Sequence, residues 1–133
     1  MSRYIIREET TLGDFSVNTK VQDNYAVIYT NGYINDLGGE LIDKECTKML
    51  QRNISNIIIN FAGSEFINSI GISILIGIIE KVSDINGRII FTNLSRANKD
   101  VFEMLGLTKF ASIFSTETEA MKYISHTSGS QYL

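Results

Sequence analysis

Two hydrophobic periodicities alternate along the chain and divide it into short segments. Apolar and polar residues alternate over 15–21, and aromatic and β-branched residues dominate 25–30, so we predict two strands that pair with each other. The run 54–61 is almost continuously apolar, which is typical of a central parallel strand buried on both faces. Residues 88–92 predict a further strand, and 110–114 predict a short last one.

Helical spacing of apolar residues appears between these strands. Ile42, Cys46 and Met49 fall on one face of a helix predicted over 37–51. Further helices are predicted over 70–84, 95–105 and 116–124. The alternation of strands and helices predicts a single α/β domain, a mixed and mostly parallel sheet of four to five strands with about four helices packed on it.

Short polar residues mark the predicted helix ends. Asp36 is the candidate cap of the first helix. Ser95 is a candidate cap of the third helix, and Gly106 suits the left-handed position that closes it. Thr116 and Glu119 fit a capping box that opens the last helix.

The two ends of the chain carry weaker patterns. Residues 1–13 mix apolar and charged side chains, which predicts either an edge strand or an N-terminal extension. We place the domain itself at 14–125. A flexible tail is expected over 126–133, and it contains the one histidine, His126.

Composition narrows the classes of function. The 133-residue chain is 44% hydrophobic and 20% charged, and its net charge of -3 argues against nucleic acid and anionic membranes as partners. The lone Cys46 cannot form an intramolecular disulfide and is expected to be a small core residue. With no signal-peptide pattern, the cytoplasm is the expected location. One histidine and one cysteine leave little material for a metal site or a nucleophile pair, so no metal, cofactor or catalytic residue is predicted.

The helix predicted over 70–84 has a narrow polar face. Projected at about 100° per residue, its isoleucine, leucine and valine residues, Ile70 and Ile72 among them, cover most of the circumference. The remaining strip carries Ser69, Ser73, Gly77, Glu80 and Asp84. Such a strip is either the solvent face of a mostly buried helix or a docking site where small side chains let a partner approach closely.

Ser69 lies between the predicted central strand and this helix. A helix N-terminus offers free backbone N–H groups and a partial positive charge. Asn68 or Ser69 can be a simple helix cap, or the Ser69 hydroxyl can mark a place where an anion such as a phosphoryl group is stabilised. From the residues alone, both interpretations stay open.

Three segments, in the right order and spacing, resemble the STAS domain family and within it the bacterial anti-sigma factor antagonists. The segment 59–72 resembles the family's strand, short loop and Asp-Ser-Ser/Thr-Gly-Leu-Gly turn before an apolar helix. The segment 30–35 resembles its Gly-Glu-Leu-Asp turn, and 101–107 resembles its Leu-Phe-x-x-x-Gly-Leu helix end. The resemblance spans about residues 14–125.

The resemblance implies a regulatory binding module and not an enzyme. Such proteins bind an anti-sigma factor, itself a serine kinase, and thereby release a sigma factor. The kinase phosphorylates the serine of the motif, which is Ser69 here, and a PP2C-type phosphatase reverses the reaction. A monomer or weak dimer is expected. Together with the polar strip, the resemblance implies these partner-binding residues: Asn35, Asp36, Asn68, Ser69, Ile70, Gly71, Ile72, Ser73 and Gly77.

Four positions depart from the family's pattern. Asn35 and Asn68 stand where the family has acidic residues, Ile70 stands in place of the second hydroxyl, and Ser73 stands in place of the second glycine. Amides in place of carboxylates make this surface less negative, which bears on kinase recognition at Ser69. Ser73 is an alternative acceptor, although it lies one turn further into the helix and is less accessible.

Two other functions compete with phosphorylation-controlled antagonism. The amides suit a constitutive, non-phosphorylated binding subunit of a stress-signalling scaffold or of a transporter, roles in which STAS-like domains also occur. An enzyme is disfavoured, because no carboxylate pair and no glycine-rich phosphate loop stand out. A nucleotide held at the Ser69 turn would be ligand binding and not turnover.

Overall fold

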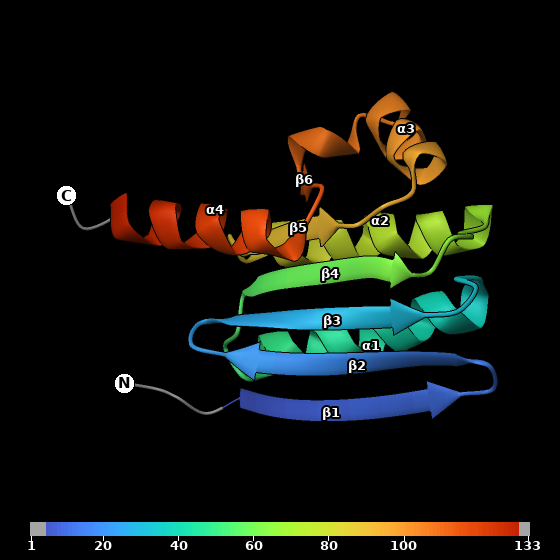
Figure 1. Ribbon diagram of the computed structural model, residues 1–133, viewed down its shortest axis with the longest axis horizontal. Coiled ribbons are helices and arrows are strands. Elements are labelled where there is room, and N and C mark those ends of the chain that lie inside the picture. The colour runs from blue at the N-terminus through green and yellow to red at the C-terminus, as the bar shows by residue number, and fades with distance from the viewer. Residues whose placement is uncertain (1–4, 131–133) are drawn as a thin grey trace.

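The computed structural model describes the backbone of residues 5–130 and the side chains of residues 7–126 (Figure 1). The strands are β1 (Ile5–Leu12), β2 (Phe15–Gln22), β3 (Tyr25–Asn31), β4 (Asn56–Gly63), β5 (Arg88–Thr92) and β6 (Ser112–Phe114). The helices are α1 (Asp36–Gln51), α2 (Ser69–Asp84), α3 (Arg96–Met104) and α4 (Glu117–Ser130), with one short 3-10 turn, η1 (Leu107–Lys109).

One mixed sheet runs through the domain in the order β1-β2-β3-β4-β5-β6. The pairs β1–β2 and β2–β3 are antiparallel, and the three pairs from β3 to β6 are parallel. The predicted α/β class is therefore confirmed, but six strands form where four to five were expected. The difference comes from the ends of the sheet: β1 pairs with β2 along its whole length, and β6 adds three residues beside β5.

Helices cover the two faces of the sheet unequally. Helices α1 and α2 lie on one face, behind the strands in Figure 1, and α4 crosses the other face over β4 and β5. The larger core lies under α1 and α2 and includes Ile59 and Phe91, while a smaller core lies under α4 and includes Ile58 and Ile90. Successive residues of β4 thus enter opposite cores, which explains why the run 54–61 shows no polar alternation.

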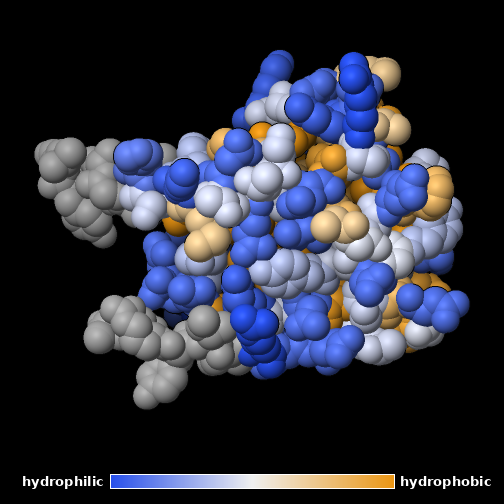
Figure 2. All heavy atoms as spheres, in the orientation of Figure 1, coloured by the Kyte–Doolittle hydropathy of each residue, from blue (hydrophilic) through white to orange (hydrophobic). Residues whose placement is uncertain are grey.

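The face of β1 and β2 away from α1 is open to solvent. Val17 and Thr19 of β2 are buried under α1, whereas Asn18 between them is exposed beside Glu9 of β1. The near face over these strands is accordingly mostly hydrophilic (Figure 2). A polar outer face suits an antiparallel sheet edge that no helix covers.

A half-buried polar cluster fastens the start of α4 to the sheet. The Glu117 carboxylate accepts hydrogen bonds from Tyr29 Oη at 3.0 Å, Lys20 Nζ at 3.2 Å and Asn60 Nδ2 at 3.3 Å. Burial and the hydrogen bond to Glu117 both raise the pKa of the Tyr29 phenol, which therefore stays protonated as a donor. One carboxylate thus ties together β2, β3 and β4.

Most helix-end predictions are confirmed, and one is wrong. The Ser95 hydroxyl caps α3, Gly106 has the left-handed φ of +74°, and Thr116 and Glu119 form the reciprocal hydrogen bonds of a capping box. Asp36 is not a cap: it is the first residue of α1, and the capping oxygen belongs to the residue before it. Asn35 and Asp36 are both good capping residues, and the path of the chain after β3 places Asn35 at the capping position.

The ends of the chain differ in part from expectation. The predicted N-terminal segment forms an edge strand from Ile5, which decides between the two alternatives for the described part of 1–13. Helix α4 continues to Ser130, so most of the predicted tail 126–133 is helical. Residues 1–4 and 131–133 lie outside the described residues.

An aromatic cluster attaches α3 to the sheet and generates the first prediction. The Phe102 ring is fully buried and lies 5.4 Å from the Phe91 ring, which in turn makes an edge contact with Phe61 at 5.2 Å. We expect Phe102→Ala to lower the free energy of unfolding by about 3–5 kcal/mol in urea titrations. Met104→Ala, on the same helix with its side chain 80% exposed, is the control and should change it by less than about 0.5 kcal/mol. Equal effects of the two variants would contradict this packing.

Candidate functional site

Two loops meet at the carboxyl ends of β3 and β4. These strands are parallel neighbours, so the segments that leave them emerge at the same edge of the sheet (Figure 1). One isolated bridge joins the loops, between Ile34 and Ile67. The Ile34 N–H donates to the Phe66 carbonyl at 2.9 Å, and the Asn68 N–H donates to the Ile34 carbonyl at 3.0 Å. The N-termini of α1 and α2 are therefore fixed side by side.

Both helices are capped by the amides that depart from the family pattern. The Asn35 Oδ1 accepts the Gly38 N–H at 3.0 Å, and the Asn68 Oδ1 accepts the Gly71 N–H at 2.8 Å. The sequence left Asn68 and Ser69 as alternative caps, and the structure selects Asn68. Each amide oxygen satisfies one free backbone N–H, as a carboxylate would, but brings no charge to the helix end.

Ser69 is the first residue of α2, and its side chain is exposed. Because the neighbouring Asn68 side chain supplies the cap, the Ser69 hydroxyl is not needed for that purpose. It lies in the first turn, where the helix dipole favours negative charge. An accessible hydroxyl beside free N–H groups is suited to carry an anionic group.

The loop before Ser69 is anchored at three points. The Thr30 hydroxyl donates to Ser64 Oγ at 2.8 Å in a buried contact, and Asn98 Nδ2 of α3 donates to the Glu65 carbonyl at 2.9 Å. The third anchor is the Phe66 carbonyl, which accepts from Ile34. This anchoring holds the Ser69 turn in one place without any contribution from Ser69 itself.

The predicted strip on α2 is exposed along its length. Ser69, Ser73, Gly77, Glu80 and Asp84 all lie on the solvent side of the helix. Ile70 differs from the projection, which counted it among the residues that cover the buried circumference, because its side chain is 53% exposed. In the same first turn, Gly71 is buried and Ile72 is half-buried, so these two residues face the core instead.

The nine predicted partner-binding residues fall into two groups. Asp36, Ser69, Ile70, Ser73 and Gly77 are exposed and available for contact. Asn35, Asn68, Gly71 and Ile72 are buried or half-buried and shape the backbone instead. All nine come from α1, α2 and the residues just before them, so they lie at one edge of the sheet and along one helix.

Four exposed apolar residues surround this turn, and three of them were missed from the sequence. Tyr33, Leu37, Phe66 and Ile70 are between 49% and 65% exposed, and we call them the apolar rim. Tyr33, Asn35 and Leu37 line one shallow cavity of about 240 Å³ beside the β1–β2 turn. For Tyr33 and Phe66, the available signal was a bulky apolar residue in a loop that leaves a parallel strand, where a polar residue is the norm.

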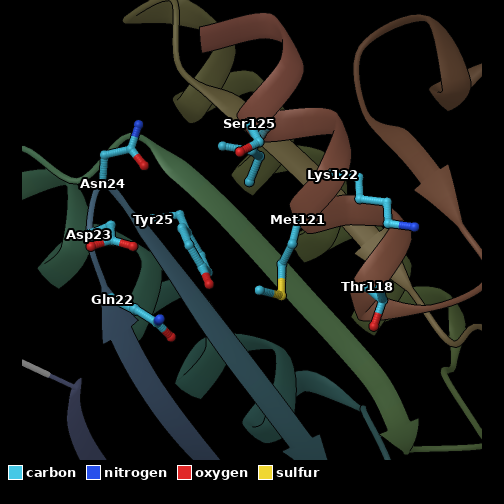
Figure 3. A pocket seen from close by; sticks show the side chains of 9 residues that line it. Gln22, Asp23, Asn24, Tyr25, Thr118, Met121, Lys122 and Ser125 are labelled. Atoms are coloured by element: carbon cyan, nitrogen blue, oxygen red, sulfur yellow. The ribbon is translucent and has the colours of Figure 1, made fainter. Parts of the chain in front are cut away.

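A larger cavity of about 410 Å³ lies at the opposite end of the sheet, between the β2–β3 turn and α4 (Figure 3). Asp23 and Asn24 stand on one side of it, and Met121 and Lys122 on the other. None of the nine predicted residues lines it.

Three other features bear on the class of site. Cys46 is fully buried, and burial raises the pKa of its thiol, so it is the core residue that the sequence predicted. Within residues 5–130, no group of three His, Cys, Asp or Glu side chains is placed to hold a metal ion. The same stretch contains no helix long and apolar enough to cross a membrane.

Comparisons with known proteins agree with this geometry. A family model described as the STAS domain matches residues 16–120. The fold is similar to that of the anti-sigma factor antagonist SpoIIAA of Bacillus in its unphosphorylated form, with a TM-score of 0.65 and 21% identity over 90% of this chain and 98% of that one. SpoIIAA is also known in a phosphorylated form, which matches comparably.

Two further structures extend the likeness. An anti-sigma factor antagonist from Mycobacterium paratuberculosis has a TM-score of 0.70 and 18% identity, over 84% of this chain and 94% of that chain. A Ser-to-Glu variant of RsbS from Moorella thermoacetica has a TM-score of 0.72 and 13% identity, over 84% and 97%. At these identities the likeness concerns the fold.

The close approach of the two loops generates the second prediction. A Cβ placed on Gly71 would lie 2.5 Å from the Ile34 carbonyl oxygen, whereas one on Gly77 would meet nothing within 4 Å. Gly71→Ala should therefore lower the free energy of unfolding by about 1–3 kcal/mol. Gly77→Ala is the matched control on the same helix and should raise it by about 0.5–1 kcal/mol, because glycine is unfavourable in a helix interior. Chemical denaturation of both variants checks the pair, and a neutral Gly71→Ala would refute the tight contact.

Proposed function

Because the chain belongs to the STAS domain family, we propose that it is an anti-sigma factor antagonist. It binds an anti-sigma factor that is also a serine kinase, and a sigma factor is released as a consequence. Phosphorylation of Ser69 by that kinase switches the binding off, and a PP2C-type phosphatase restores it. The observation that carries the proposal is the exposed Ser69 hydroxyl at the head of α2, on a turn that its neighbours hold fixed.

The surface around Ser69 supports a protein partner. The apolar rim offers two aromatic and two aliphatic side chains, all about half or more exposed. Aromatic anchors surrounded by polar groups are typical of the centre of a binding surface. Ser73 and Gly77 continue this surface along α2 with side chains small enough to let another backbone approach closely.

The electrostatics of the turn support a switch that needs no refolding. A phosphoryl group adds about -1.5 to -2 charges at neutral pH. In the free protein that charge would lie at the N-terminus of α2, where the helix dipole favours it. The neutral amides of Asn35 and Asn68 add no repulsion there. A partner fitted to a neutral hydroxyl, in contrast, would meet a bulky, strongly solvated dianion among the apolar rim.

Phosphorylation at Ser69 is the third prediction. Incubation with ATP and the anti-sigma kinase of the host cell should add the mass of one phosphoryl group to the intact protein, as measured by mass spectrometry. Ser69→Ala should abolish the adduct, because no other hydroxyl stands in the first turn of α2. Ser73→Ala is the control and should be phosphorylated as the unaltered chain is. An adduct that persists in Ser69→Ala, or one lost only in Ser73→Ala, would overturn the assignment of the acceptor.

The fourth prediction separates charge from folding. Ser69→Asp places a carboxylate in the first turn of α2, where it should raise the free energy of unfolding by about 0.3–1 kcal/mol. The same variant should bind the anti-sigma factor more weakly than Ser69→Ala in calorimetric titration. If Ser69→Asp were destabilised, its weaker binding would reflect unfolding, and the proposed mechanism of the switch would be wrong.

A second candidate function rests on the two amide caps. Asn35 and Asn68 hold the turn without the acidic residues that the family carries at these positions. A chain that lacks them suits constitutive binding in a stress-signalling scaffold or a transporter, with no phosphorylation of Ser69. An affinity pull-down that recovers such an assembly and no kinase, together with an unmodified Ser69, favours this alternative.

A further inference from the structure

A second apolar surface lies at the far end of α2 from Ser69. Ile76 and Ile79 of α2 face Leu107 of η1, and Phe110 directly after η1, across a groove of about 310 Å³. We call it the α2–η1 groove. Ile79 and Leu107 are buried and form its floor, while the Phe110 ring is 62% exposed at its rim. The left-handed Gly106 turns the chain after α3 so that Leu107 enters the core and Phe110 remains outside.

The charged residues that line the groove are both acidic. Glu80 and Asp84 stand on its rim, one turn apart on α2, and both are exposed. The nearest cation on the helix, Lys81, is turned toward α1, where it binds Asp43 Oδ1 at 2.7 Å and Thr47 Oγ1 at 2.8 Å. The groove therefore combines an apolar floor with a negative rim.

The groove and the Ser69 turn belong to one continuous surface. Glu80 and Asp84 end the same exposed strip that Ser69 begins. At a rise of 1.5 Å per residue, the eleven positions from Ser69 to Glu80 span about 17 Å. A specific interface buries about 800 Å² on each partner, which corresponds to a patch roughly 30 Å across. A partner seated on the Ser69 turn with an interface of ordinary size thus reaches the groove.

We propose that the α2–η1 groove is a second docking site for the anti-sigma factor, and that it receives an amphipathic helix of that partner. Large apolar side chains of this helix enter between Ile76 and Phe110, and Lys or Arg residues beside them face Glu80 and Asp84. An apolar groove with a charged rim is the usual receptor for such a helix. The proposal rests on the function proposed above, and it adds a contact that phosphorylation of Ser69 does not touch.

The test measures binding of the anti-sigma kinase to full-length variants by surface plasmon resonance. Phe110→Ala should weaken the affinity by about tenfold or more, because the ring is the exposed anchor of the groove. The double variant Glu80→Lys/Asp84→Lys should lower the association rate about tenfold at low salt and much less at high salt. Met104→Ala and Glu103→Lys, on the neighbouring α3, are the matched apolar and charged controls and should bind unchanged. Urea unfolding of each variant verifies that the fold is kept.

Each outcome decides between the two proposals. If the kinase binds the unaltered chain, and Ser69 phosphorylation blocks it, but the groove variants bind equally well, the groove proposal alone is overturned. If the kinase does not bind the unaltered chain at all, the proposed function fails and the groove proposal fails with it. If Phe110→Ala instead dissociates a homodimer in sedimentation analysis and leaves kinase binding intact, a second copy of this chain occupies the groove and the proposal is wrong.

Discussion

The backbone pairing of Ile34 with Ile67 is the constraint on which the candidate site depends. Parallel strands only bring their loops to the same edge of the sheet, and loops left to themselves would move independently. The two hydrogen bonds at Ile34 remove that freedom, and they place the first turns of α1 and α2 together. Gly71 makes the pairing possible, because any larger side chain would displace the Ile34 carbonyl. The Ser69 hydroxyl therefore stands on a turn whose backbone is held in place by hydrogen bonds between the two loops.

The amide caps change the charge of the Ser69 turn without changing its backbone geometry. An asparagine and an aspartate accept the same backbone N–H at a helix end, so Asn35 and Asn68 preserve the geometry that acidic residues would give. What disappears is the negative charge that would partly neutralise the two helix dipoles. A phosphoryl group on Ser69 would meet less repulsion here, while a kinase that recognises acidic residues would find fewer of them. The lower repulsion favours a phosphorylated Ser69, whereas the loss of acidic residues disfavours recognition by such a kinase. Phosphorylation and constitutive binding are therefore separate functions that experiments can distinguish.

The rest of the fold discourages the sheet from pairing with other sheets and leaves one face of α2 exposed. The edge strand β1 is exposed and charged, with Glu8 paired to Lys48 of α1, and the opposite edge strand β6 has only three residues. Charged and short edges both discourage pairing with other sheets. The open polar face of β1 and β2 and the Glu117 cluster under α4 likewise offer little apolar surface. Several of the large exposed apolar side chains lie instead at the Ser69 turn, and Phe110 lies at the α2–η1 groove, at the two ends of α2.

The sequence by itself determined the class of fold, most element boundaries and the position of the turn that precedes α2. These features follow from local periodicity and cap chemistry: the unbroken apolar run of β4 and the polar strip of α2 are visible without coordinates. Only the tertiary structure decided that β1 joins the sheet, that Asn35 and not Asp36 caps α1, and that Ile70 is exposed. It also revealed that Phe66 and Tyr33 lie on the surface beside the Ser69 turn, and that Phe110 lies on the surface beside Glu80 and Asp84. Burial and strand pairing depend on neighbours that are distant along the chain. An apolar residue in a loop therefore looks the same in the sequence whether its side chain is buried in the core or exposed on the surface.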